Sequence, residues 1–144
     1  MRLTVFTDYA LRVLMYLAVK PERRVTIRDV AEAYGISRNH LMKVVNKLTR
    51  AKLIEASRGV NGGLMLARTP DSITVGEVVR NTEDEIALVE CFRPDNQCII
   101  TPECALKNVF GEAQAAFLEV IDGYTLADLM APRSRLAKRL RISA

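Results

Sequence analysis

The chain has 144 residues, of which 49% are hydrophobic and 26% are charged, and its formal net charge is +4. This length suffices for one hydrophobic core, or for a small domain with an extension. No apolar run approaches the roughly 20 residues that cross a bilayer, so the sequence excludes a transmembrane helix and predicts no membrane partner. The first residues lead directly into a charged amphipathic segment without a signal peptide, so we expect a cytoplasmic protein with reduced thiols.

Charge is distributed unevenly along the chain. Residues 1–70 contain 13 Lys and Arg against 5 Asp and Glu, a net charge of +8, whereas residues 71–144 carry a net charge of −4. A basic half is typical of a surface that binds a polyanion. The asymmetry predicts a basic binding half joined to a half with another role, and uneven surface charge without function is the alternative.

The first predicted helix follows Thr7, a residue type that favours the N-cap position. Pro21 is expected to end this helix. Its apolar residues recur at helical spacing and form one face: Ala10, Leu11, Leu14, Met15, Leu17 and Ala18. Asp8 lies in the first turn, where a carboxylate favours the positive end of the helix dipole, so the residues alone assign it a capping role.

The next two predicted helices have the pattern of a helix-turn-helix. Thr26 and Asp29 form a capping-box pattern that opens a short helix, and Gly35 ends it. A second helix is predicted from Arg38 to about residue 52, with Ser37 as its N-cap. Its inner stripe is Leu41, Val44, Val45 and Leu48. Two short helices joined by a tight turn are typical of this motif.

The outer face of the second helix carries side chains suited to phosphates and to base edges in the major groove. They are Arg38, Asn39, His40, Lys43, Asn46, Lys47 and Arg50. A solvated basic helix is the alternative. The coincidence of the turn, the caps and the polar face favours recognition of double-stranded DNA.

Residues 55–67 read as two short strands around a glycine-rich tip, which predicts a β-hairpin directly after the recognition helix. Such a hairpin is a wing. Arg58 stands at the base of the tip, where it could reach a minor groove, and Asn61 and Gly62 are the other predicted DNA contacts of the wing. The glycines could also be turn residues only, and no Gly-Lys-Ser/Thr follows to make a phosphate-binding loop.

All three cysteines lie in one irregular stretch, at Cys91, Cys98 and Cys104. A short helix from Val75 to about residue 80 and an exposed acidic turn, residues 83–85, precede it. Three is an unusual number for disulfides, the spacing is wider than the C-x2-C of structural zinc sites, and no His stands nearby. Soft thiolates on wide spacing suit an iron-sulfur cluster better than zinc. On spacing alone, a cluster, zinc, a redox thiol and inert buried cysteines all remain open.

After Cys104 a long helix is predicted, with apolar residues at alternating steps of four and three. They are Leu106, Phe110, Ala113, Phe117, Val120 and Tyr124. This spacing is typical of a helix that pairs with another helix, so we expect a homodimer, and packing on the chain's own domain is the alternative. A two-fold dimer would place its recognition helices about 34 Å apart on a palindromic site.

Thr125 and Asp128 repeat the capping-box pattern and predict a further short helix, which Pro132 is expected to end. The basic tail beyond it is expected to be a partly ordered terminus without an assigned function. The fold class is therefore mainly α with a small β wing. Its expected parts are a winged helix-turn-helix DNA-binding domain (residues 1–80), a cysteine loop (81–104), a dimerisation helix with a short helix after it (105–131) and the basic tail (132–144).

Four stretches together resemble the IscR/NsrR family of iron-sulfur winged-helix regulators: residues 3–12, 35–46, 58–63 and 98–107. The resemblance covers nearly the whole chain except the basic tail. The segment from Ser37 to His40 and the Ile-Thr-Pro before Cys104 are similar to the nitric-oxide-sensing branch. Lys107 stands where the IscR-like branch has a cluster-binding His, which argues against that kind of site.

The resemblance implies that Cys91, Cys98 and Cys104 hold the cluster, with Asp8 of the partner subunit as the fourth ligand. It favours a 4Fe-4S cluster over a 2Fe-2S cluster, and it makes Arg12 a candidate switch partner of Asp8. The implied function is a homodimeric repressor that releases its palindromic operator when nitric oxide nitrosylates the cluster, and so controls nitrosative-stress genes.

Three other functions are alternatives. A regulator of the same family could report general redox state or iron-sulfur status, and a zinc-structured DNA-binding module would not sense at all. An enzyme with a cysteine nucleophile needs a general base nearby, and the only histidine, His40, lies in the recognition helix. We therefore expect that the protein is not an enzyme.

Overall fold

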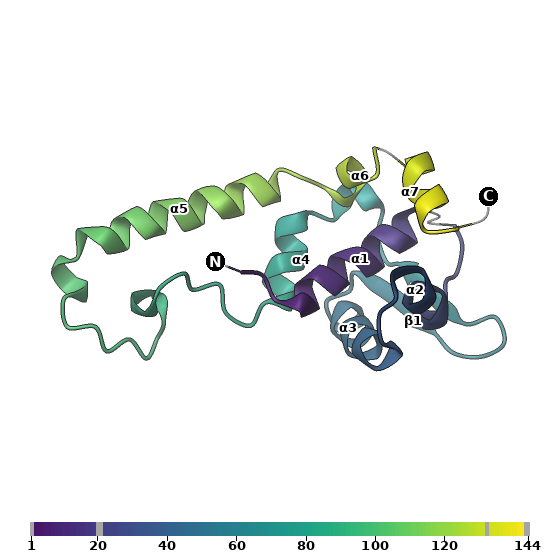
Figure 1. The fold of residues 1–144 in the computed structure, drawn as a ribbon, viewed down its shortest axis with the longest axis horizontal. Coiled ribbons are helices and arrows are strands. Elements are labelled where there is room, and N and C mark those ends of the chain that lie inside the picture. Colours follow the sequence, from purple (N-terminus) through teal and green to yellow (C-terminus); the bar gives the residue numbers. More distant parts are fainter. Residues whose placement is uncertain (1, 20–21, 132, 143–144) are drawn as a thin grey trace.

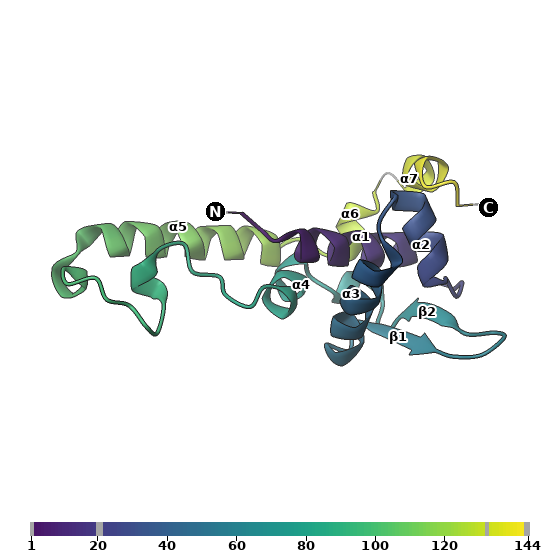
Figure 2. The ribbon, with the colours of Figure 1, turned by 60° about the horizontal axis from the view of Figure 1, so that its bottom comes forward.

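The computed structural model describes residues 2–19, 22–131 and 133–142 (Figure 1). A winged-helix domain forms one end, and a long arm, residues 83–124, projects from it (Figures 1 and 2). The helices of the domain are α1 (Val5–Val19), α2 (Ile27–Tyr34), α3 (Arg38–Arg50), α4 (Val75–Thr82), α6 (Leu126–Leu129) and α7 (Arg133–Arg139). Its strands are β1 (Ile54–Ser57) and β2 (Gly63–Leu66), and the arm contains α5 (Ala105–Asp122). Across the described ranges, no helix combines the length and apolar character needed to cross a membrane.

Helix α1 lies at the centre of the domain, in contact with α3, α4, α6, α7 and β2. The predicted core positions Ala10, Leu14, Leu17 and Ala18 are buried. Leu11 and Met15 are only half-buried, and further residues of α1 that the prediction omitted are buried: Val13, Tyr16 and Val19. The helix is buried on more than one side because elements from both halves of the chain surround it.

The prediction that Thr7 caps α1 is wrong. The helix begins two residues earlier, at Val5, and Thr7 is fully buried inside it. Thr4 precedes the helix, and its hydroxyl accepts a hydrogen bond from the Thr7 backbone N–H at 3.3 Å. The carboxylate of Glu83 accepts another from the Thr4 backbone N–H at 2.8 Å. A backbone N–H at the start of this helix therefore has its hydrogen-bond partner in a residue far away in the sequence.

The helix-turn-helix is confirmed, with small differences at its ends. Thr26 and Asp29 make both hydrogen bonds of the capping box, and Gly35 has a left-handed φ of 64°. Ser37 occupies the N-cap position of α3, but its hydroxyl makes no capping hydrogen bond. The predicted inner stripe of α3 is buried, and the helix ends at Arg50, slightly earlier than expected.

The wing is a two-stranded antiparallel hairpin in which Ile54 pairs with Leu66 and Ser57 with Gly63. Val25 extends the hairpin on the other side of β2 through a bridge to Leu64. The Val25 N–H donates to the Leu64 carbonyl at 3.0 Å, and the Leu64 N–H donates to the Val25 carbonyl at 2.7 Å. The segment between α1 and α2 therefore fixes the base of the wing to the domain.

The arm rejoins the domain alongside α4, the helix from whose end it leaves. The backbone N–H of Val75 donates to the Tyr124 carbonyl at 2.8 Å, and that of Leu126 donates to the Ile73 carbonyl at 2.8 Å. The Arg80 guanidinium and the Asp122 carboxylate form an ion pair between α4 and α5. No residue of α5 is buried, and the helix ends before Tyr124, which was predicted to continue its apolar stripe.

The C-terminal region packs on the domain. The predicted capping box of Thr125 and Asp128 opens α6, as expected. Residues 133–142 were expected to be partly ordered, but they form α7 and a following turn, so that expectation is wrong. Its partly buried apolar residues pack against the core: Leu136, Ala137, Leu140 and Ile142. Arg133 Nε also donates to the Val19 carbonyl at 2.8 Å. Pro21 and Pro132, predicted as helix ends, lie outside the described residues.

Candidate nucleic-acid interface and cysteine loop

The outer face of α3 presents most of the predicted DNA contacts to solvent. The exposed residues are Arg38, Asn39, His40, Lys43 and Asn46, and Lys47 is partly exposed. The opposite stripe of α3 is buried, which fixes the rotation of the helix and so directs these polar side chains outward. The ring of His40 lies 6.3 Å from that of Tyr9, so the first turn of α3 is held against α1.

The wing lies on the same side of α1 as α3 (Figures 1 and 2), and α3 contacts β1 directly. Arg58 and Asn61 are exposed at its tip. The Gly62 N–H donates to the Gly59 carbonyl at 2.9 Å and closes the turn. A Cβ at Gly62 would come within 2.5 Å of the Ser57 carbonyl oxygen, so the tip requires glycine there.

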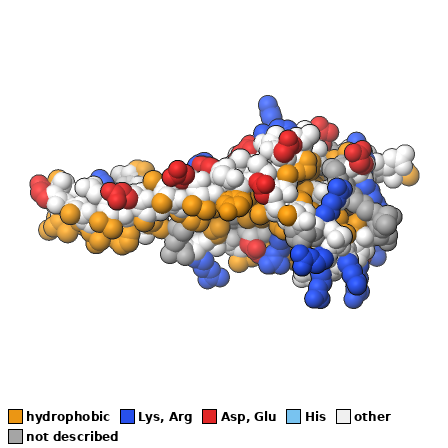
Figure 3. Space-filling view, turned by 90° about the horizontal axis from the view of Figure 1, so that it is seen from above, with side chains coloured by type: hydrophobic (Ala, Val, Ile, Leu, Met, Phe, Trp, Pro, Cys, Tyr) orange, Lys and Arg blue, Asp and Glu red, His pale blue; other side chains and the backbone are white. Residues whose placement is uncertain are grey.

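Arg24 is a basic residue of this surface that the sequence did not indicate. Its Nη1 donates to the Ser57 hydroxyl at 2.7 Å, at the base of the wing tip. Arg24 reaches that position because its neighbour Val25 bridges to Leu64. Such a long-range pairing leaves no local sequence signal. Figure 3 shows Lys and Arg side chains gathered at the winged-helix end, whereas hydrophobic side chains run along the arm.

The segment of residues 91–104, which carries the three cysteines, lies on the arm before α5, at a distance from the domain (Figure 1). Cys91 belongs to a single 3-10 turn, and Cys104 directly precedes α5. All three thiols are half-buried and none forms a disulfide. Hydrogen bonds within the stretch order it locally: the Cys98 N–H donates to Asn96 Oδ1 at 2.9 Å, and the Thr101 hydroxyl donates to the Cys98 carbonyl at 2.8 Å.

Within the part of the chain that the structure describes, no three His, Cys, Asp or Glu side chains come close enough together to hold one metal ion. The three cysteines predicted as ligands therefore lie on one segment but do not surround one point. Their chemistry fits an iron-sulfur cluster, because three unpaired thiols without a neighbouring His form a soft donor set that lacks one ligand. A hollow of about 590 Å³ opens beside Cys104 and Lys107, which leaves room next to the last thiol.

Asp8 and Arg12 are brought together, as predicted. The Asp8 Oδ2 and Arg12 Nη2 atoms are 2.9 Å apart across one turn of α1. The Arg12 guanidinium also lies 5.8 Å from the centre of the Tyr34 ring. Burial raises the pKa of Tyr34 to about 12, although Arg12 acts in the opposite direction, so this hydroxyl is protonated at neutral pH. Asp8 is exposed and its carboxylate is accessible from outside the chain.

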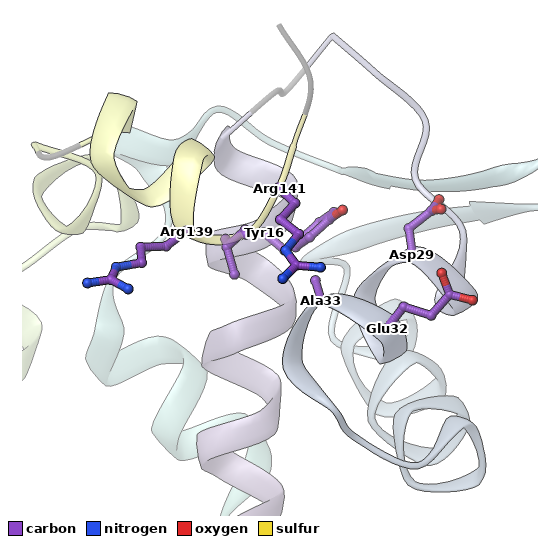
Figure 4. Close-up of a pocket in the computed structure, with 7 residues that line it drawn as sticks. Tyr16, Asp29, Glu32, Ala33, Arg139 and Arg141 are labelled. Atoms are coloured by element: carbon purple, nitrogen blue, oxygen red, sulfur yellow. The ribbon is translucent and has the colours of Figure 1, made fainter.

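Another hollow, of about 520 Å³, separates α2 from the C-terminal residues (Figure 4). Its acids already have partners, because Asp29 accepts from Thr26 at 2.8 Å and Glu32 from Arg28 at 2.7 Å. Arg139 points away from both acids in Figure 4. The side chains do not converge on one point, and no predicted site residue lines the hollow, so we assign it no ligand.

Residues 3–132 match a family model, Rrf2, which is described as an iron-dependent transcriptional regulator. The chain belongs to the Rrf2 family. It is 47% identical over 142 residues to the HTH-type transcriptional regulator NsrR of Bacillus licheniformis, covering 97% of this chain and 99% of that protein. It is 50% identical over 132 residues to the NsrR of Shouchella clausii, covering 90% and 89%.

Solved structures of Rrf2-like regulators share the fold. CymR, the global cysteine regulator of B. subtilis, superimposes with a TM-score of 0.74 at 28% identity and covers 90% of this chain and 95% of its own. IscR of T. potens gives a TM-score of 0.74 at 25% identity, with 100% and 93% covered. The predicted fold class is confirmed, and this Rrf2-family chain is a DNA-binding transcriptional regulator and not an enzyme.

Proposed function

We propose that the protein is a homodimeric repressor that holds an iron-sulfur cluster on Cys91, Cys98 and Cys104 and releases a palindromic operator when nitric oxide attacks that cluster. The observation that carries the proposal is three unpaired, half-buried thiols on the arm of a winged-helix chain. The identity of 47% to a regulator named NsrR supports the same conclusion. Nitrosative-stress genes are the proposed targets.

The donor set suggests how the chain would use such a group. A bound cluster supplies iron to which nitric oxide can coordinate. The three thiolates would hold it on the arm, and Asp8 of the partner subunit is the proposed fourth ligand. A carboxylate oxygen is a harder donor than a thiolate, so its bond to iron would be the weakest of the four. We favour a 4Fe-4S cluster over a 2Fe-2S cluster, by resemblance to the nitric-oxide-sensing branch.

Arg12 is the proposed switch residue. Within one chain it already forms an ion pair with Asp8 at 2.9 Å, so it offers the carboxylate a partner when it is not bound to iron. If the Asp8 carboxylate exchanged iron for Arg12 as its partner, the contacts of α1 would change. Because α1 packs against α3, that change would reach the recognition helix.

The exposed apolar face of α5 supports the dimer. Leu106, Val109 and Val120 are 56%, 58% and 60% exposed. Figure 3 shows hydrophobic side chains along the arm without a cover from the rest of the chain. A second copy of α5 would bury them. The proposed dimer contacts are Leu106, Phe110, Ala113, Phe117 and Val120.

The cluster is tested with anaerobically purified protein. Iron and sulfide analysis with Mössbauer spectroscopy should show a cluster, and the spectrum should change when nitric oxide is added. Cys98→Ala should lose the iron and the effect of nitric oxide on DNA binding. Gln97→Ala, beside it in the stretch, should retain both. A parent protein without iron, or a Cys98→Ala variant that still responds to nitric oxide, would remove the sensor role.

The alternative, a regulator that reports redox state or iron-sulfur status, is distinguished by comparing which compounds release the DNA. DNA recovered from a random pool by binding to the protein serves as the operator. We expect nitric oxide to release it more effectively than peroxide or an iron chelator does. Equal release by all three would favour a sensor of redox state or iron-sulfur status.

Arg58→Ala should weaken binding to the same operator by about 1–3 kcal/mol, because an exposed arginine at the wing tip is placed to contact DNA. Fluorescence anisotropy measures the affinity. The control is Arg135→Ala on α7, which lies across α1 from the wing (Figure 2). Equal affinities of Arg58→Ala and the parent protein would show that the wing does not take part in recognition.

A further inference from the structure

Three consecutive acids follow α4, and each contacts a different part of the molecule. The sequence predicted this segment, Glu83 to Glu85, as an exposed acidic turn. Glu83 is instead half-buried, and its Oε1 accepts from the Thr4 N–H at 2.8 Å and from the Thr4 hydroxyl at 3.0 Å. The Thr7 hydroxyl donates to the same carboxylate. This residue fixes the start of the segment to α1.

The protonation state of Glu83 supports this anchoring role. Burial raises the pKa of the carboxyl group, but hydrogen bonds from Thr7 and Thr4 together outweigh burial, and the net pKa is below its usual value. Glu83 is therefore ionised at neutral pH, where it accepts these hydrogen bonds most strongly.

Asp84 contacts the recognition helix. Its Oδ1 lies 3.6 Å from the Lys47 Nζ, on the outer face of α3. Among the described residues, Lys47 is the cation of α3 that forms an ion pair with a carboxylate. Its side chain is 43% exposed, so a DNA phosphate could reach the same ammonium group. Asp84 and DNA would therefore compete for Lys47.

Glu85 contacts the three-cysteine stretch. Its Oε1 lies 3.0 Å from Arg93 Nε, and Arg93 follows Cys91 by two residues. A single residue, Asp84, thus separates an anchor on α1 from a link to the cysteines. Since consecutive Cα atoms are about 3.8 Å apart, a shift of the Glu85 backbone by more than this distance has to move Asp84 as well.

We propose that residues 83–85 form a coupling segment that transmits the position of the three-cysteine stretch to Lys47, and that Asp84 is a positioning residue for this DNA contact. The proposal rests on the proposed function, because it needs Lys47 to contact DNA and the cysteines to respond to a signal. When Asp84 holds Lys47, less positive charge faces the phosphates. When the stretch draws Asp84 away, Lys47 becomes free to bind them.

The size of the effect should be judged on DNA binding and not on folding. Asp84 is 98% exposed, and pairs of this kind add little to stability because water and salt screen them. A change of one phosphate contact, in contrast, changes the slope of log affinity against log salt by about 0.9. That slope is measurable with DNA of any sequence.

The first test uses the full chain and a mixed-sequence DNA duplex. Asp84→Asn should raise the affinity and steepen the salt slope by up to about 0.9. Asp71→Asn removes the same charge from the exposed 3-10 turn Pro70–Ser72 and serves as the matched control. Lys47→Ala should abolish the effect of Asp84→Asn. If Asp84→Asn behaves like Asp71→Asn, or if its effect persists in the Lys47→Ala background, the proposal is overturned.

The second test asks whether the cysteines communicate through the segment. We expect nitric oxide to change the salt slope of the parent protein, and Glu85→Arg or Arg93→Glu alone to reduce that change. The double variant with both charges exchanged should restore it, which a purely structural defect would not. Single variants that respond like the parent protein would overturn the coupling alone, whereas a parent protein without iron or DNA binding would overturn the proposed function as well.

Discussion

Replacing Leu48 by alanine is expected to lower the free energy of unfolding by about 2–5 kcal/mol, because it removes several buried methyl and methylene groups and leaves a cavity. Leu48 is 0% exposed on the inner stripe of α3. Its carbonyl also accepts the Leu53 N–H at 3.0 Å, where the chain turns from α3 into β1. Since a domain of this size has about 5–15 kcal/mol of stability in total, the loss would be severe.

Urea denaturation followed by circular dichroism measures the change. The control is Arg50→Ala, an exposed residue of the same helix, which should alter stability by no more than about 0.5 kcal/mol. The DNA affinity of Leu48→Ala provides a second readout, because the buried stripe sets the rotation of α3 beneath its polar face; Arg50→Ala is a control for stability alone, since Arg50 belongs to that face. A Leu48→Ala variant as stable as the parent protein would show that the stripe does not hold α3 in place.

Replacing Phe117 by aspartate should weaken self-association by about 30-fold or more, which corresponds to about 2 kcal/mol. Phe117 is an aromatic residue in the apolar stripe of α5, and aromatic residues near the centre of an interface commonly contribute most to its affinity. A charge there would lose its water on association without gaining a partner. Affinity for a palindromic operator should fall with it, because each monomer presents one recognition helix.

Analytical ultracentrifugation over a range of concentrations measures this effect. Glu119→Ala is the matched control, since at 3.6 residues per turn Glu119 lies on the opposite face of the helix from Phe117. It should leave the dimer intact. A parent protein that sediments as a monomer, or a Phe117→Asp variant that associates normally, would contradict the assignment of α5 as the dimer contact.

The parts of the fold that were predicted correctly depend on neighbouring residues. Thr26 with Asp29, Gly35 and the inner stripe of α3 act within a few residues of one another, so their sequence patterns were sufficient. The glycine-rich tip likewise predicted the wing. The exposed polar face of α3 followed from these elements, because burying one stripe leaves the other exposed.

The errors involve contacts between distant segments. The sequence favours Thr7 as the cap because threonine is a common N-cap residue. The helix instead begins earlier, and the carboxylate that accepts a hydrogen bond at its start comes from Glu83, at the other end of the domain's sequence. For the same reason the sequence did not indicate that Glu83 is half-buried, although Asp84 and Glu85 are exposed as expected. The tail was expected to be partly ordered because its short apolar pattern is weak alone, although the domain provides a surface for it. The three cysteines could be predicted to lie on one irregular segment, but their spacing in the sequence does not determine how the thiols are arranged in space, and within the described residues they do not surround one point.

The way the arm joins the domain bears on how regulators of this kind can diversify. The hydrogen bonds from Val75 to Tyr124 and from Leu126 to Ile73 hold the returning end of the arm against the start of α4, so the chain re-enters the domain at a fixed point. Insertions or deletions between Arg93 and α5 would leave these bonds intact, and they would also leave Glu83 and Asp84 in contact with α1 and α3. A winged-helix domain joined to its arm in this way can change the ligand that the arm binds while the packing of its own core is kept.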